Sequence, residues 1–130
     1  MKKEIGIRKN LHLIISILIV VPVALVYGFQ PDLLFDITIK SIDEANIFKA
    51  NMGLYLCFSV LWTLGILKQN YWSAATIANI IFMLGLALGR VISLIIDGLP
   101  TLIFSMGTIG ELILAIFGIY QLISHQKSTN

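Results

Sequence analysis

Residues 72–96 read WSAATIANIIFMLGLALGRVISLII, and this apolar run decides the fold class. Arg90 is its only charged residue. About 20 consecutive apolar residues suffice for a helix to cross the hydrocarbon core of a bilayer. The run is therefore predicted to be a transmembrane helix.

Three further apolar runs of similar length lie elsewhere in the chain, over about residues 11–29, 47–67 and 102–123. The first contains Pro22, which a membrane helix tolerates with a kink. No small-x-small cleavage site follows that run, so it is expected to remain as a helix rather than to be removed as a signal peptide. The predicted fold is all-α: one integral membrane domain over residues 1–130, built as an up-down bundle of four transmembrane helices.

The composition supports this assignment. Apolar residues make up 58% of the chain and charged residues 12%, whereas soluble domains carry about 25% charged residues. A chain of 130 residues has no interior large enough for so many apolar side chains, so lipid must solvate them. The net charge of +2, without aromatic–basic arrays, argues against nucleic acid as a partner.

Lysine and arginine are unevenly shared between the two sides of the predicted bundle. On the side opposite to the termini, Lys40 and Lys49 lie among several carboxylates. The positive-inside rule therefore predicts that both termini are cytoplasmic. The outer connection, about residues 30–46, is expected to be either an amphipathic helix on the membrane surface or a cap over the outer mouth of the bundle. The basic residues on the terminal side are Lys2, Lys3, Arg8, Lys9, Lys68 and Lys127.

Arg90 is the centre of a candidate polar site in the outer half of the bundle. An arginine at mid-membrane costs about 2.5–3.5 kcal/mol on insertion scales, so a partner is expected. Asp97 lies on the same helix face, but Glu111 on the next helix is the predicted partner. Both helices meet at a tight turn, and a rise of 1.5 Å per residue leaves Arg90 and Glu111 offset by roughly 6 Å. Lys49, at the outer start of the second predicted helix, is expected to join this cluster.

Small residues repeat near both charged groups, at a spacing that lets membrane helices approach closely. Asn79 is expected to form a hydrogen bond between helices. A structural clamp, in which Arg90 and Glu111 hold two closely packed helices in register, is therefore one interpretation of the pair. The small residues on the third and fourth predicted helices are Gly85, Gly89, Ser93, Gly107, Ala115 and Gly118.

No catalytic or metal-binding pattern is visible in the sequence. His12 and His125 lie near the predicted cytoplasmic ends and have no metal-ligand companions at a suitable spacing. No nucleophile has an adjacent base, and no glycine-rich loop could hold a phosphate. The protein is therefore expected not to be an enzyme and to need no metal or other cofactor.

Two segments resemble a known family. One is KANMGLYL at residues 49–56, and the more specific one is GLALGRVISLIIDG at residues 85–98, followed by Pro100 and Glu111. Together they resemble the signature of the bacterial membrane proteins filed as domain of unknown function 4345. Lys49 stands where that family is expected to have arginine, and a lysine cannot make the bidentate contact of an arginine. The resemblance implies a four-helix protein of the bacterial cytoplasmic membrane without an assigned activity, and it groups Arg90, Asp97 and Glu111 as a unit.

Three functions are compatible with these residues. The leading hypothesis is a non-enzymatic membrane protein in which Arg90, Glu111, Asp97 and Lys49 line an outward-facing pocket for a lipid-like or other small ligand. The second is a small proton-coupled transporter that works as a dimer, with Glu111 as the exchangeable carboxylate. The third is a structural or accessory subunit that uses its glycine faces to bind another copy or a partner membrane protein.

Overall fold

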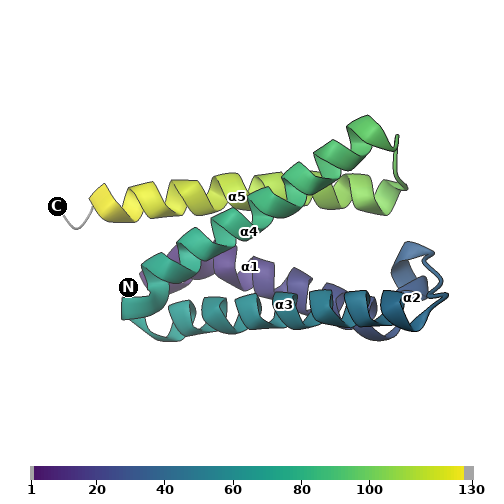
Figure 1. Ribbon diagram of the computed structural model, residues 1–130. Coiled ribbons are helices and arrows are strands. Elements are labelled where there is room, and N and C mark those ends of the chain that lie inside the picture. Colours follow the sequence, from purple (N-terminus) through teal and green to yellow (C-terminus); the bar gives the residue numbers. More distant parts are fainter. Residues whose placement is uncertain (1, 128–130) are drawn as a thin grey trace.

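The computed structural model of the protein describes residues 2–127, and the side chains within residues 6–125. The chain is 88% helical and the described residues form no strand, which confirms the all-α class. Residues 1 and 128–130 of the predicted domain lie outside this description, as do the side chains of Lys2, Lys3 and Lys127. The helices are α1 (Lys2–Phe29), α2 (Asp32–Phe35), α3 (Ile42–Leu67), α4 (Gln69–Ile96) and α5 (Leu102–Lys127) (Figure 1).

Each of the four long helices is long and apolar enough to cross a membrane. The candidate spans are Gly6–Phe29, Ile42–Leu67, Gln69–Ile96 and Leu102–His125. They contain the four predicted apolar runs, and α1, α3 and α4 end where the runs do. Most of the extra length comes from polar residues at the helix ends, which hydropathy alone assigns to connections.

The start of α3 shows why one boundary was predicted too late. The Ser41 hydroxyl accepts a hydrogen bond from the Glu44 backbone N–H at 3.1 Å, and the Glu44 carboxylate accepts one from the Lys40 N–H at 2.6 Å. This exchange resembles a capping box, in which two side chains satisfy backbone donors that have no partner inside the helix. The helix therefore begins within the segment predicted to be the outer connection.

The connections at the two ends of α4 are short. Between α3 and α4 the helix is broken only at Lys68, which has an extended backbone with φ −129° and ψ 115°. After α4, Gly98 adopts φ 101°, a conformation that a residue with a Cβ rarely enters, and the chain then turns into α5. This second turn brings the outer parts of α4 and α5 close together.

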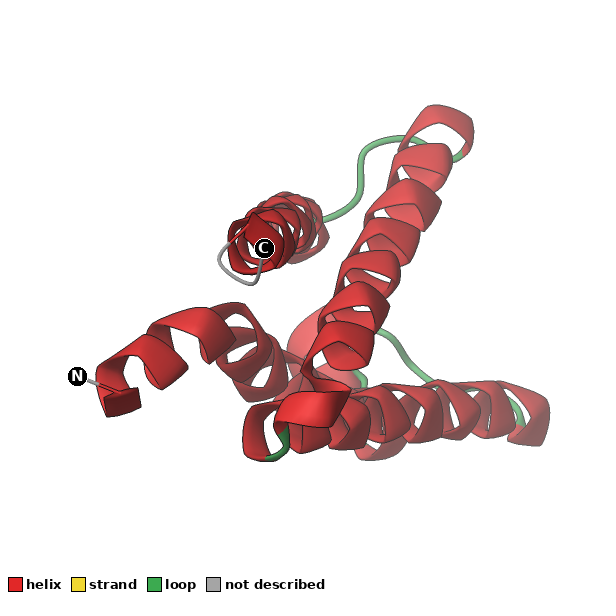
Figure 2. Ribbon diagram, turned by 90° about the vertical axis from the view of Figure 1, so that its left-hand side faces the viewer, coloured by secondary structure: helices red, strands yellow, loops and turns green. Residues whose placement is uncertain are grey.

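The long helices form two layers that α4 links. Figure 1 shows α1 and α3 running side by side, and α4 crossing obliquely from α3 toward α5. In Figure 2, α5 is seen end-on and lies apart from α3. The main helix contacts are therefore those of α1 with α3 and of α4 with α5, and α4 also packs against α3.

Side-chain contacts identify which helix ends meet. At one end, Lys9 Nζ donates to Gln69 Oε1 at 2.8 Å, and Gln121 Nε2 donates to the Arg8 carbonyl at 2.9 Å. These contacts join the start of α1, the start of α4 and the end of α5. At the other end, the rings of Phe35 and Phe104 stack at 5.1 Å and join α2 to α5.

Close helix packing occurs at the predicted Gly118 and also at Gly65, which was not predicted. A Cβ at Gly65 would collide with Ala75, and one at Gly118 would lie 2.8 Å from Ile80 Cγ1. In contrast, a Cβ at Gly85 or Gly89 would have no neighbour within 4 Å, and both glycines are exposed. The prediction that Gly85, Gly89 and Ser93 pack against another helix of this chain is therefore wrong, whereas Ala115 and Gly118 are buried.

Gly85 and Gly89 are exposed because another side of α4 packs against the rest of the chain. Its buried positions include Asn79, Met83 and Ala87, and Arg90 continues the same side of the helix. At about 100° per residue, Gly85 lies roughly 200° from Met83 and so points to the opposite side. Gly85 and Gly89 therefore lie on the exposed side of α4, away from Asn79, Met83 and Ala87.

A polar core lies in the half of the molecule nearer the Lys9–Gln69 contact. His12 Nε2 is 3.1 Å from Thr76 Oγ1, and the Ser16 hydroxyl donates to the His12 carbonyl at 2.8 Å. Asn79 is fully buried beside this core, one turn from Thr76, but neither its Oδ1 nor its Nδ2 has a hydrogen-bond partner among the described residues. The predicted interhelical hydrogen bond of Asn79 is therefore absent from the described contacts.

Candidate functional site

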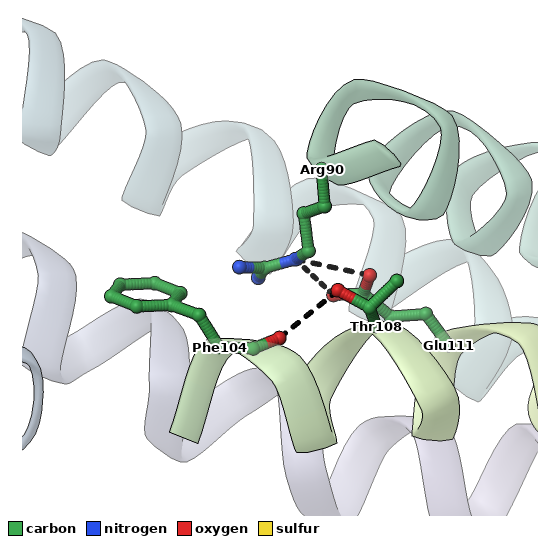
Figure 3. A network of polar contacts seen from close by, with 4 residues as sticks. All are labelled: Arg90, Phe104, Thr108 and Glu111. Carbon is green, nitrogen blue, oxygen red and sulfur yellow. Dashed lines mark hydrogen bonds and ion pairs between the residues drawn. The ribbon is translucent and has the colours of Figure 1, made fainter. Parts of the chain in front are cut away.

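Arg90 on α4 and Glu111 on α5 form an ion pair (Figure 3). The Arg90 Nε–H points at both carboxylate oxygens, at 3.0 Å from Oε1 and 3.1 Å from Oε2. The two side chains are 22% and 11% exposed, so water does little to screen their attraction. The short connection between α4 and α5 brings the two side chains together, because each residue lies only a few helical turns from that connection.

Asp97 and Lys49 lie outside this pair. Asp97 terminates α4, is exposed, and accepts a hydrogen bond from the Ser93 hydroxyl at 2.8 Å. Lys49 is also exposed, and no described contact joins it to Arg90 or Glu111. The predicted cluster of four charged residues therefore reduces to Arg90 and Glu111, and Ser93 serves as the partner of Asp97.

The guanidinium has two further neighbours. Its Cζ lies 5.2 Å from the centre of the Phe104 ring, within cation–π distance. The Tyr27 side chain, from α1, also interacts with it. Figure 3 shows the terminal nitrogens of Arg90 pointing away from Glu111 and toward the side of Phe104. The Thr108 hydroxyl, next to the pair, donates to the Phe104 carbonyl at 3.0 Å.

Arg90 and Glu111 line a cavity of about 350 Å³. Every helix contributes to its wall, and most of the lining is aliphatic, aromatic or methionine. Gly107 and Gly110 also face it: a Cβ at Gly107 would lie 4.0 Å from Arg90 Cζ, and one at Gly110 would meet nothing within 4 Å. Gly107 was predicted to pack against a helix, but it lines the cavity instead. Apolar lining residues include Val20, Val23, Leu34, Met83, Leu86 and Leu114.

Stacked aromatic rings lie beside the cavity, at the end where α2 meets α5. Phe35 on α2 lies between Tyr27, at 4.6 Å between ring centres, and Phe104, at 5.1 Å. Tyr55 on α3 meets Tyr27 edge-on at 6.0 Å and also lines the cavity. Within the connection predicted to be either a surface helix or a cap, Phe35 is buried whereas Leu33 and Leu34 are exposed, and the choice between the two alternatives stays a prediction. We call Tyr27, Phe35 and Phe104 the aromatic roof.

Sequence reasoning missed these aromatic residues. The signal was present, since Leu33, Leu34 and Phe35 form a short apolar group between Asp32 and Asp36. A helix of one turn, however, has no periodicity that could show which side it buries. His12 was also set aside, yet it is fully buried in contact with Thr76.

The arrangement has the general form of a small-molecule site. Such sites are concave, mostly apolar, and carry a few polar groups that orient the ligand. Here the polar group is one neutralised ion pair with donors left over, in a wall of apolar side chains. This combination suits the binding of an amphipathic molecule better than acid–base or nucleophilic chemistry.

Comparison with known proteins gives a family. Neither a search of curated proteins nor a search of solved structures found a match. A family model described as "Domain of unknown function (DUF4345)" matches residues 9–122, which include all the residues of the candidate site. The match confirms the resemblance seen in residues 49–56 and 85–98. This chain, with its four membrane-type helices and its Arg90–Glu111 cavity, belongs to the DUF4345 family.

Proposed function

We propose that this protein is a multi-pass protein of the bacterial cytoplasmic membrane that binds a small amphipathic molecule in the Arg90–Glu111 cavity, without catalysing a reaction. The observation that carries the proposal is that the ion pair lines a cavity instead of being enclosed between packed side chains. A pair that served only as a clamp would have no need of about 350 Å³ beside it. Protein interiors rarely leave such space empty.

The membrane orientation belongs to the same proposal. Contacts among Arg8, Lys9, Gln69 and Gln121 gather the start of α1, the start of α4 and the end of α5 at one end of the molecule. The basic residues predicted to be cytoplasmic belong to these segments. With that end in the cytoplasm, the four helices cross in alternating directions, and the cavity and the aromatic roof lie in the outer half of the bilayer.

The ion pair weighs against Glu111 as an exchangeable carboxylate of a proton-coupled transporter. Both Glu111 oxygens lie within hydrogen-bond distance of Arg90 Nε. Uptake of a proton by Glu111 would remove the charge that holds Arg90, so Arg90 would have to be released in each transport cycle. Ligand binding needs no such cycle.

The proposal is tested by native mass spectrometry of the protein released from mild detergent. Wild type is compared with Gly110→Leu, which places a side chain into the cavity, and with Gly85→Leu, which adds the same side chain on the exposed side of α4. We expect a discrete bound mass in the wild type and in Gly85→Leu that is absent from Gly110→Leu. Equal retention in all three proteins, or no bound mass in any, would refute the proposal.

Arg90→Ala and Glu111→Gln complete this set. If the pair orients the ligand, each variant releases the bound mass while it remains folded, as judged by its helical circular dichroism. Variants that lose thermal stability and yet keep the bound mass would support the clamp instead.

A further inference from the structure

We infer that the ligand of this cavity has a single acyl or similar chain and an uncharged head group whose oxygen accepts hydrogen bonds, such as a carbonyl or hydroxyl oxygen. The inference rests on the proposed function and adds the chemical class of the ligand. It follows from three properties of the cavity: its charge, its free donors and its size.

The charge of the cavity is already balanced. Arg90 and Glu111 are the charged groups that line it, and they carry opposite unit charges at 3.0 Å. Lys49 and Asp97, the nearest other candidates from the sequence, are exposed and are not part of the lining. An anionic head placed here would leave one negative charge without a counterion in an apolar wall, which is costly. A cationic head would have the same difficulty with the opposite sign.

Donors nevertheless remain for a neutral acceptor. An arginine side chain has five N–H donors, and Glu111 takes only the one on Nε. The terminal amino groups carry the other four, and the single Tyr27 hydroxyl beside them cannot accept them all. They point away from Glu111 in Figure 3, on the side of Phe104. A carbonyl or hydroxyl oxygen of a ligand could accept from them without adding charge.

The size of the cavity limits the rest of the ligand. If each heavy-atom group takes about as much space as a water molecule, roughly 30 Å³, a volume of about 350 Å³ holds about a dozen groups. That volume suits a compact head group and part of one chain. The aliphatic lining below Arg90, with Val20, Met83 and Leu114, suits the chain, and the aromatic roof covers the head.

The test compares two ligands that differ by one charged group: a monoacylglycerol and the monoacylglycerol phosphate with the same chain. Each is added to the purified protein in mild detergent, and bound protein is counted by native mass spectrometry over a range of ligand concentrations. We expect wild type to prefer the uncharged ligand by at least about tenfold, which corresponds to about 1.4 kcal/mol. A preference of wild type for the phosphate would overturn the inference while leaving the proposed function intact.

The substitution Glu111→Gln provides the sharper result. It removes the negative charge and leaves Arg90 as an uncompensated cation, so the preference is expected to reverse in favour of the phosphate. An unchanged order of preference in this variant would also overturn the inference. The double variant Arg90→Gln/Glu111→Gln covers the case in which Glu111→Gln does not fold, because it contains no buried charge. It is expected to bind the uncharged ligand weakly and to bind the phosphate no more tightly than wild type does. Tighter binding of the phosphate by this variant would contradict the inference.

Failure of the proposed function itself gives a separate result. In that case wild type would bind both ligands as weakly as Gly110→Leu does. The reason is that a cavity that takes no ligand in the wild type loses no binding when the leucine side chain fills it.

Discussion

Arg90 Nε lies 3.0 Å from Glu111 Oε1, across two helices and 21 positions along the chain. The pair combines two properties that rarely coincide. It is buried enough to be costly if one member is lost, yet it lines a cavity that could admit another molecule. A structural role and a role in ligand binding therefore have different consequences when either residue is replaced.

The stability of the pair is expected to depend on both members together. Arg90→Ala leaves the Glu111 carboxylate buried without its partner, and breaking a buried pair costs about 3–5 kcal/mol. The loss should lie near the lower limit, because Arg90 keeps 22% of its surface exposed. The double variant Arg90→Met/Glu111→Leu removes both charges and should unfold at nearly the wild-type midpoint. The free energy of unfolding of Arg90→Ala and of the double variant can be measured by unfolding in mixed micelles with increasing denaturing detergent. Additive losses in the double variant would contradict this coupling.

The aromatic roof is expected to control how long a ligand stays. Phe35→Ala removes the ring that stacks on both Tyr27 and Phe104, and each such aromatic pair contributes about 0.5–1.5 kcal/mol beyond its buried area. We expect a loss of roughly 2–3 kcal/mol in stability, together with faster release of the bound molecule.

Phe29→Ala is the matched control for the roof, since Phe29 is also a phenylalanine of the outer region but is 66% exposed. It should leave both stability and release close to wild type. Identical release rates for the two variants, measured by exchange of a bound fluorescent monoacylglycerol, would exclude a gating role for Phe35.

The contact between Arg90 and Glu111 could be predicted because it depends on local geometry. Both residues are counted from the same short turn, and the rise of an α-helix then determines their relative height. The four helices could be predicted for a similar reason, since length and hydropathy belong to each segment by itself. Lys49 could not be placed in the same way, because the long connection before α3 leaves its position undetermined until the helices pack.

The wrong predictions concern which side of a helix meets which neighbour. The spacing of Gly85, Gly89 and Ser93 correctly describes one side of α4, but a spacing contains no information about what that side faces. Of the glycines that allow close approach, Gly118 belongs to the predicted set of small residues, whereas Gly65 is isolated and no repeat reveals it. The cavity itself arises from the crossing of α4 between two layers, which no single segment encodes.

Substitution of glycine by alanine should reproduce this distinction. A Cβ at Gly118 would lie 2.8 Å from Ile80 Cγ1 and 3.6 Å from His12 Cδ2, so Gly118→Ala is expected to destabilise the protein by about 1–3 kcal/mol. Gly89→Ala meets nothing within 4 Å and should be neutral or stabilising by up to about 1 kcal/mol, because alanine favours the helix. Thermal unfolding of Gly118→Ala and Gly89→Ala in the same detergent tests both expectations. A marked loss in Gly89→Ala would indicate that this side of α4 is packed against another molecule.

Asn79 offers a test of the polar core. Its side chain is fully buried and both polar atoms of its amide have no partner among the described residues, whereas the neighbouring Thr76 hydroxyl is 3.1 Å from His12 Nε2. An unsatisfied buried polar group costs about 1–3 kcal/mol, so Asn79→Leu, which keeps the size of the side chain, should raise stability by a similar amount. Thr76→Val should lower it by about 1 kcal/mol, because His12 then loses its partner. Unfolding midpoints of the two variants should therefore move in opposite directions from wild type. A loss of stability in Asn79→Leu would instead mean that internal water satisfies the amide, and that the polar core is hydrated rather than dry.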